Sequence, residues 1–360
     1  MENLERHLVS RKERINSLIN LRTIHNHGYN LPACSPHETS EGGPLWGIIA
    51  KIVAHNLKMT KNPLVLFLIF ASVHCTAQDL LESVPIQFVE NYIFIEVTIN
   101  DTEKPLNFLF DTGAGITVVD TKVAEQLSLD INAQSKISTS GKSLLSKESI
   151  SNIVTIGKNI ILDSINLVLM DLNHLTKYLN TNVDGVIGFD LLNKFVTETN
   201  IDSKEMRFYD SMTFKYIGNS EPIQLTTLES NLFGILINAV PKNTSESLAF
   251  NFQIDTGADN YLSFHNKTVQ EYQLVDINKK HKFKKGFGAD STLSRNIRSK
   301  VNSVSFGSKK WKNIPVMLEV DPINRREKSL ADGLIGQRLL LDFNIIYNLE
   351  KRLVYLEKRK

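Results

Sequence analysis

The sequence predicts an all-β protein whose folded part is built from two similar halves. Three observations lead to this prediction: segments rich in β-branched and aromatic residues recur along the chain, turn-forming residues separate them, and a set of short motifs occurs twice in the same order. The chain has 360 residues, of which 42% are hydrophobic and 22% charged. This composition suits two globular domains and excludes a disordered or collagen-like chain.

Strands are expected at matching places in the two halves, because β-branched and aromatic residues dominate these segments. The expected strands are 92–99, 159–170 and 206–209 in the first half and 232–237, 312–320 and 353–356 in the second. Residues 211–221 are the expected connector. One helix is predicted in the first half, from apolar residues near helical spacing. These residues are Val118, Val119, Val123, Ala124 and Leu127.

The repeat is clearest in two motifs. Residues 107–114, Asn-Phe-Leu-Phe-Asp-Thr-Gly-Ala, recur at 251–258 as Asn-Phe-Gln-Ile-Asp-Thr-Gly-Ala, with six of eight positions identical. An Asp-Gly-apolar-apolar-Gly segment follows in each half, at 184–188 and 332–336, and begins 73 residues after the first aspartate in one half and 77 in the other. We therefore expect an internal duplication. The expected lobes are residues 78–212 and 213–360.

Two Asp-Thr-Gly-Ala motifs in one duplicated chain resemble the aspartic peptidases. The alanine after each motif, the short repeat units and the absence of cysteine after residue 77 resemble the retropepsin-like branch of that family. The resemblance covers nearly all of 85–360. It implies two homologous β-barrel lobes of the retropepsin or pepsin type, related by a pseudo-twofold axis, with the active site in the cleft between them.

The resemblance implies that Asp111 and Asp255 are the catalytic pair of an aspartic endopeptidase. Two carboxylates held close together cannot both ionise, so they share one proton and provide one acid and one base. A water between them would attack the peptide bond of a polypeptide substrate. The pair titrates as a unit, so neither residue is labelled as the acid or the base.

The residues that follow each aspartate are expected to support the pair. Glycine permits a tight turn and lets backbone N–H groups approach the carboxylates. In the family, the threonine hydroxyls reach across to the opposite loop. Alanine stands where pepsin-like enzymes carry a hydroxyl that can donate to the carboxylate, so we expect a raised pKa and a pH optimum nearer neutrality than that of pepsin. These six residues are Thr112, Gly113, Ala114, Thr256, Gly257 and Ala258.

Two further features are expected from the resemblance. The segments 184–188 and 332–336 are similar to the element that braces the catalytic loops, and Asp184 and Asp332 are interpreted as turn formers. A β-hairpin flap lies between each catalytic aspartate and this element, and the candidate flap tips are Gly141, Gly286, Phe287 and Gly288. The other interpretation of these tips is plain polar surface loops, so the number of working flaps stays open.

Residues 59–77 are predicted to be a signal peptide. The apolar run 64–73 is ten residues long, whereas a bilayer span needs about 20, and small residues precede a cleavage site between Ala77 and Gln78. Residues 1–58 are then an upstream extension, either a mis-called start or a cytoplasmic segment. We expect an exported protein, periplasmic or secreted, without a membrane span in its mature part.

Other function classes have little support. The formal net charge is +2 and no long block of like charges occurs, which argues against nucleic acid as a partner. The histidines beyond residue 77 are isolated, so neither a metal nor another cofactor is expected. They are His174, His265 and His281. The basic run 279–285 is a candidate for tuning the charge of the substrate.

The alternative function is a non-catalytic peptide-binding protein of the envelope that keeps the cleft. We expect a monomer, because both motifs lie in one chain; pairing of halves across two chains is the other possibility.

Overall fold

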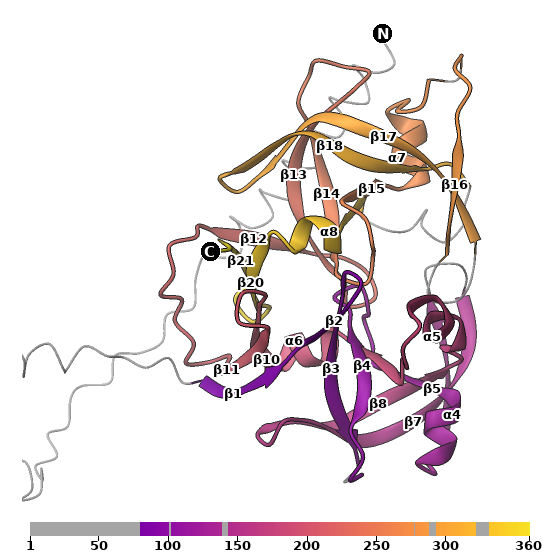
Figure 1. Cartoon of the computed structure of the whole chain (residues 1–360), viewed down its shortest axis with the longest axis vertical. Coiled ribbons are helices and arrows are strands. Elements are labelled where there is room, and N and C mark those ends of the chain that lie inside the picture. Colours follow the sequence, from indigo (N-terminus) through magenta and orange to yellow (C-terminus); the bar gives the residue numbers. More distant parts are fainter. Residues whose placement is uncertain (1–79, 101, 139–142, 277, 288–292, 322–330) are drawn as a thin grey trace, which may run out of the picture. The chain divides into compact units, whose positions relative to one another are not determined.

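The computed structural model describes residues 80–100, 102–138, 143–276, 278–287, 293–321 and 331–360, all within the unit Thr76–Lys360. The predicted signal peptide and the extension before it lie outside these residues. The described part is mostly β and forms two β lobes built on two sheets, as the repeated strand pattern predicted (Figure 1). No helix in this part is long and apolar enough to cross a membrane.

The elements of residues 80–210 occur in a fixed order. The strands are β1 (Leu80–Pro85), β2 (Gln87–Val89), β3 (Tyr92–Ile99), β4 (Leu106–Phe110), β5 (Val118–Asp120), β6 (Ala133–Ser138), β7 (Ser143–Ile156), β8 (Ile160–Met170), β9 (Gly185–Ile187), β10 (Phe195–Asn200) and β11 (Glu205–Asp210). The helices are α4 (Thr121–Gln126), α5 (Asn173–Leu179) and α6 (Phe189–Lys194).

Residues 222–358 repeat this order with small differences. The strands are β12 (Pro222–Thr227), β13 (Phe233–Pro241), β14 (Leu248–Asp255), β15 (Leu262–Phe264), β16 (Phe283–Phe287), β17 (Leu293–Phe306), β18 (Lys309–Glu319), β19 (Gly333–Gly336), β20 (Phe343–Asn348) and β21 (Leu353–Lys358). The helices are α7 (Asn266–Glu271) and α8 (Gln337–Leu340). No helix or strand occurs between Asp210 and Pro222, as expected for the connector.

Corresponding strands pair in the same way in both halves. The first half forms an eight-stranded sheet in the order β2-β3-β4-β9-β5-β8-β7-β6, and an additional pairing of β3 with β7 brings this sheet around on itself. In the second half the series β13-β14-β19-β15-β18-β17-β16 has the same order, with an additional pairing of β13 with β17. In each half a strand that leads to an Asp-Thr-Gly motif runs parallel to the strand of the later glycine motif.

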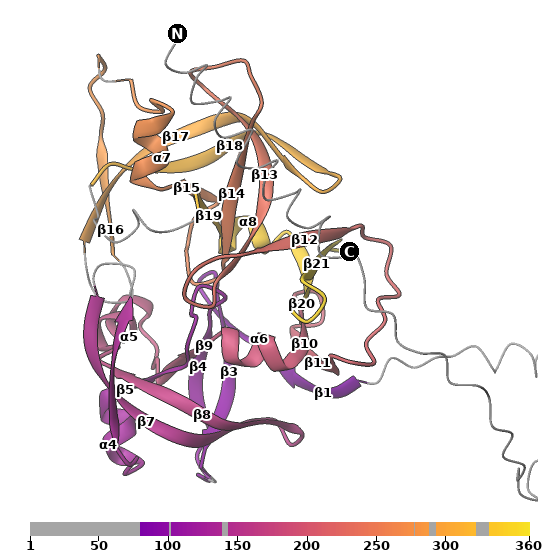
Figure 2. The same ribbon diagram turned by 180° about the vertical axis from the view of Figure 1, so that it is seen from behind.

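One sheet joins the two halves. Strand β10 pairs antiparallel with β20 through Thr197, Glu198 and Thr199, which gives the strand order β1-β11-β10-β20-β21-β12. The order is symmetric: β1, β11 and β10 of the first half occupy the places that β12, β21 and β20 of the second half occupy from the other end. Figure 2 shows these strands from behind, with β10 and β11 of the first half beside β20 and β21 of the second.

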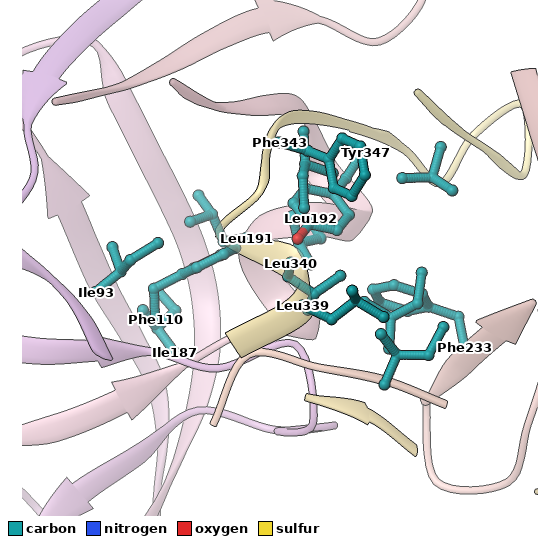
Figure 3. Packing of buried hydrophobic residues seen from close by; sticks show 14 of the residues in the cluster. Ile93, Phe110, Ile187, Leu191, Leu192, Phe233, Leu339, Leu340, Phe343 and Tyr347 are labelled. Carbon is teal, nitrogen blue, oxygen red and sulfur yellow. The ribbon is translucent and has the colours of Figure 1, made fainter. Parts of the chain in front are cut away.

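The main hydrophobic core continues across this junction. Tyr347 of β20 is fully buried, and its ring meets Phe110 and Phe233 edge-on at centroid distances of 6.2 Å each. Figure 3 shows Phe110 together with Ile187 and Leu191 of the first half, and Phe233 with Leu339 of the second, in this cluster. The strands that carry the two aspartates therefore end on a single packed core.

The helix predicted after the first motif is partly wrong. Val118 and Val119 belong to strand β5, and the helix α4 begins only at Thr121. Both valines are buried and pair with β8 on one side and β9 on the other, where β-branched side chains fit a sheet covered on both faces. Asp120 is the last residue of β5 and the N-cap of α4, where its Oδ1 accepts the amide of Lys122.

Candidate active site

The two aspartates stand at the ends of buried strands. Asp111 directly follows β4, and its amide donates to the carbonyl of Ile187 in the neighbouring parallel strand β9 at 2.9 Å. Asp255 is the last residue of β14 and is paired with Gly336 of the parallel strand β19. These contacts with β9 and β19 fix the backbone position from which each aspartate side chain extends.

Thr112 and Thr256 link the two loops by four hydrogen bonds. The Thr112 hydroxyl donates to the carbonyl of Ile254 at 2.9 Å, and the Thr256 hydroxyl donates to the carbonyl of Phe110 at 3.0 Å. Each hydroxyl also accepts the backbone N–H of the other threonine, at 2.9 and 3.0 Å. Both threonines are buried, so water does not compete for these bonds.

This interlock brings the carboxylates of Asp111 and Asp255 together. A Cβ atom built on Gly113 would lie 2.8 Å from Oδ1 of Asp255 and 3.0 Å from Oδ1 of Asp111. A Cβ atom on Gly257 would lie 2.5 Å from Cγ of Asp111. Both contacts are too short for a side chain, so glycine is required at both positions.

The electrostatics of the pair favour a retained proton. Burial is the largest influence on Asp111, and it raises the pKa of this carboxyl above its ordinary value. Three hydrogen bonds act in the opposite direction: Oδ1 of Asp111 accepts the N–H of Gly113 at 2.7 Å and that of Gly257 at 3.1 Å, and the side chain of Asp255 contributes the third. The pair can therefore hold one proton and one negative charge.

The alanines join each loop to the helix that follows the bracing strand. The carbonyl of Ala114 accepts the amide of Phe189 at 2.9 Å, and the carbonyl of Ala258 accepts the amide of Gln337 at 2.8 Å. Ala114 also packs against an apolar cluster of the first half that contains Phe94. A methyl group leaves the carboxylates without a hydroxyl donor from this position.

Asp184 and Asp332 have a structural role, as expected, but they act through bonds to distant strands and not as local turn formers. Oδ2 of Asp184 accepts the amide of Asn107, and Oδ2 of Asp332 accepts the amide of Asn251, each at 2.8 Å. These amides lie at the start of β4 and within β14, the strands that lead to the catalytic candidates. The two carboxylates thus hold the strands and do not join Asp111 and Asp255.

The candidate flap tips are only partly described. Gly141 and Gly288 lie outside the described residues. Strands β6 and β7, which precede and follow Gly141 in the sequence, pair antiparallel. Gly286 and Phe287 are not at a turn: both belong to strand β16, and Gly286 is paired with Ser294 of β17. The expectation for these two residues is therefore corrected, because the strand continues through the glycine.

The histidines noted in the sequence lie apart from one another. His265 occupies the N-cap position of α7 without a side-chain cap bond, and its Nδ1 lies 3.5 Å from Oε2 of the buried Glu319. Nε2 of His281 contacts the carbonyl of Asp276 at 2.6 Å. His174 belongs to α5. Within the residues that the structure describes, no group of three or more histidine, cysteine, aspartate or glutamate side chains is arranged to hold a metal ion.

Asp259 is a site residue that sequence reasoning missed. Arg338 binds it with two bonds, from Nε to Oδ1 at 2.7 Å and from Nη2 to Oδ2 at 2.8 Å, and Asn91 of the first half donates to Oδ1 at 2.8 Å. The bonds from Arg338 are the largest influence on this carboxyl and lower its pKa; burial acts in the opposite direction, and the bond from Asn91 lowers the pKa further. Gly115 holds the equivalent place after the first motif, and its carbonyl accepts Nδ2 of Asn231. In the sequence, the only sign of this role is that Asp259 stands where the first half has Gly115, four residues after the aspartate of the motif.

Tyr92 is a second residue that the sequence pattern did not single out. It begins β3 and packs against the apolar cluster that also contacts Ala114. Burial raises the pKa of its phenol, and the negative charges of Asp259, Asp255 and Asp111 act in the same direction. Tyr92 is therefore a neutral hydroxyl within electrostatic range of both carboxylates.

Comparison with known proteins identifies one domain. Residues 95–191 match the family model described as aspartyl protease. The matched range contains Asp111 and the bracing segment 184–188, and it ends before Asp255. A comparison with curated proteins gave no match. An aspartyl protease domain is therefore present at 95–191.

Proposed function

We propose that this protein is an aspartic endopeptidase in which Asp111 and Asp255 act together on one water molecule. The observation that carries the proposal is the approach of the two carboxylates across the threonine interlock, where Gly113 would have no room for a Cβ between them. The match of the first half to the aspartyl protease family supports the same activity.

The chemistry follows from one shared proton. The ionised carboxylate accepts a proton from the bound water as the water oxygen attacks the carbonyl carbon of the substrate. The protonated carboxyl donates its proton to the carbonyl oxygen, which gives a tetrahedral intermediate. The carbon–nitrogen bond then breaks as the leaving nitrogen takes the proton that the first carboxyl had accepted from the water. One hydroxyl of the intermediate gives its proton to the other carboxylate. No covalent bond to the enzyme forms, and the pair ends with one proton.

The correspondence of the two halves supports an internal duplication as the origin of the pair. The strands leading to Asp111 and Asp255 pair in the same manner, and Asp184 and Asp332 hold them by equivalent bonds. A structural turn has no need for an acid at both places, whereas a shared proton requires one from each half.

The proposal includes a polypeptide substrate and a monomeric enzyme. Both aspartates belong to one chain, and the threonine bonds that link their loops lie within that chain, so a second chain is not needed to complete the pair. Export to the periplasm or the medium remains part of the proposal and rests on residues 59–77. Mass spectrometry of the natural protein would test export, since a mature chain beginning at Gln78 is expected and an intact Met1 would contradict it.

The test is cleavage of an unfolded protein by the purified chain, with and without pepstatin. Wild type is expected to cleave, pepstatin to inhibit it, and Asp111→Asn to be inactive while keeping its circular dichroism spectrum. Equal activity of the variant and wild type would eliminate the pair as the catalyst. Peptide binding without cleavage in wild type would instead favour the non-catalytic envelope protein.

A further inference from the structure

Two asparagines, Asn91 and Asn231, lie in turns that reach from one half to the other. Asn91 belongs to the turn between β2 and β3, and Asn231 to the loop between β12 and β13. Each stands three residues before a strand residue whose partner lies two positions before Asp111 or Asp255. These pairs are Phe94 with Leu109 and Gly234 with Gln253. The two asparagines therefore occupy equivalent positions of the repeat.

Asn91 contacts the loop that follows Asp255. Its Nδ2 donates to Oδ1 of Asp259 at 2.8 Å. Arg338 of α8 holds the same carboxylate with two bonds, at 2.7 and 2.8 Å. In Figure 1 the end of the β2–β3 hairpin points toward α8. The turn of the first half is thus tied to the second half at the fourth residue after Asp255.

Asn231 contacts the loop that follows Asp111 at the equivalent residue. Its Nδ2 donates to the carbonyl of Gly115, the fourth residue after Asp111, at 3.0 Å. The backbones approach closely here, since a Cβ atom on Gly115 would lie 1.9 Å from the carbonyl oxygen of Ser230. Glycine is therefore required at this position. The loop of the second half packs directly on the backbone of the first.

The two contacts differ because the two turns differ in length. Two residues form the turn between β2 and β3, because Val89 pairs with Tyr92. Five residues form the loop between β12 and β13, because Thr227 pairs with Phe233. The longer loop reaches the backbone of the opposite half, whereas the shorter turn meets a side chain, that of Asp259. This difference accounts for glycine in one half and aspartate in the other.

Each aspartate loop is consequently held at two places by the opposite half. The threonine bonds hold it at the residue next to the aspartate, and the asparagine bond holds it three residues further along. If the threonine bonds acted alone, the loop could rotate about them and the carboxylate would turn with it. The second contact removes this freedom.

From these contacts we propose that Asn91 and Asn231 are positioning residues for the carboxylate pair, each fixing the loop of the opposite half so that both carboxyls reach one water molecule. This inference rests on the proposed function. The asparagines act through Asp259 and Gly115. Because a misplacement of about 1 Å can cost on the order of a hundredfold in rate, the loss of one of these bonds should be visible in kcat.

The first experiment reverses one of the bonds. In Asn91→Asp the new carboxylate would face that of Asp259, so repulsion replaces the hydrogen bond. For one peptide we expect kcat to fall by about tenfold, while KM changes by less than about twofold. In the double variant Asn91→Asp/Asp259→Asn the carboxylate and the amide have exchanged places, and the bond can form in the opposite direction. Its kcat is expected to exceed that of Asn91→Asp by about threefold or more.

The second experiment has a matched control. Asn231→Asp keeps the shape of the side chain and removes the donor to the carbonyl of Gly115. Asn243→Asp removes a similar donor within the second half, where Nδ2 of Asn243 binds the carbonyls of Tyr272 and Gln273. Asn231 and Asn243 are both exposed. We expect kcat to fall by about tenfold in Asn231→Asp with its circular dichroism spectrum kept, and to stay at the wild-type value in Asn243→Asp.

The pH dependence of kcat separates positioning from a general loss of stability. The closer two carboxyls are held, the further apart their two apparent pKa values lie. A displaced loop should therefore bring the two limbs of the pH–rate profile toward each other, whereas the charge of a new aspartate alone would move both limbs in the same direction. We expect the narrower profile in Asn91→Asp and Asn231→Asp, and the wild-type profile in Asn243→Asp.

The outcomes distinguish this inference from the proposed function. Wild-type kcat and an unchanged profile in both Asn91→Asp and Asn231→Asp would overturn the inference and leave the peptidase standing. An equal loss in Asn243→Asp, or no recovery in the double variant, would also overturn it, because the two bonds would then have no specific effect. Absence of cleavage by the wild-type chain would overturn the proposed function, and this inference with it.

Discussion

Thr112 and Thr256 each satisfy the backbone of the other across the junction of the two halves. Each hydroxyl accepts the opposite threonine amide and donates to the carbonyl of the residue that precedes the opposite aspartate. The backbone on both sides of Asp111 and Asp255 is therefore held by the partner half. The four bonds therefore join the two loops that carry the carboxylates.

Thr112→Val is expected to lower the free energy of unfolding by about 2–4 kcal/mol. Valine keeps the shape but leaves the carbonyl of Ile254 and the amide of Thr256 without a partner, and an unsatisfied buried group costs about 1–3 kcal/mol. Urea denaturation would measure the loss. Thr112→Ser, which keeps the hydroxyl, is the control and is expected to lose less. Equal destabilisation by both variants would show that the hydroxyl bonds contribute little.

Gly257→Ala is expected to reduce kcat/KM by about a hundredfold, because the new Cβ would lie 2.5 Å from the Asp111 carboxyl and displace it. Gly286→Ala is the matched control. Its Cβ would meet only the ends of Ser294 and Asn296, at 3.0 and 3.1 Å, and these side chains can move. Peptide cleavage by both variants checks the prediction. A fully active Gly257→Ala would contradict the described geometry.

Asp111→Asn is expected to be more stable than wild type near neutral pH and equal to it in acid. Burial raises the pKa of Asp111 above its ordinary value of 3.8. Below 3.8 the carboxyl is protonated in both the folded and the unfolded chain. As pH rises, the unfolded chain releases this proton first, so the wild type loses stability until the raised pKa is passed. Asparagine does not titrate and avoids this loss.

Thermal unfolding of wild type and Asp111→Asn across the acid-to-neutral range would measure the difference. The gap between their melting temperatures should widen as pH rises, whereas Asp130→Asn, an exposed control, should not reproduce it. A gap that narrows with rising pH would have the wrong sign for a carboxyl whose pKa is raised by burial.

Ala114→Ser combined with Ala258→Ser is expected to shift the pH–rate profile toward acid. A serine hydroxyl at these positions can donate to a carboxylate and favour its charged form, which lowers the apparent pKa of the pair. Cleavage rates of one peptide measured over a range of pH would detect the shift. An unchanged profile would remove the argument that the alanines set an optimum nearer neutrality.

The features that sequence predicted best are those that chemistry or local pattern dictates. The repeated Asp-Thr-Gly-Ala singled out Asp111 and Asp255, and the structure places both at the ends of equivalent strands that pair parallel with β9 and β19; their catalytic role is our proposal. The strand expected at 92–99 coincides with β3 (Tyr92–Ile99), where β-branched and aromatic residues leave little choice.

The features that sequence missed depend on distant contacts. Val118 and Val119 have helical spacing with later residues, yet two neighbouring strands draw them into β5. The bond between Asp259 and Arg338 spans 79 residues, and the contact with Asn91 spans 168. No local pattern signals such partners, and the pairing of β10 with β20 likewise follows only from the folded halves.

The most direct measurement compares kcat/KM of wild type, Asp111→Asn and Asp255→Asn on one peptide that the wild-type chain cleaves. If the two carboxyls share a single proton, each substitution alone should reduce kcat/KM by about a thousandfold or more while both variants stay folded. Wild-type activity in either variant would mean that one carboxylate is dispensable, and the shared-water mechanism would be wrong.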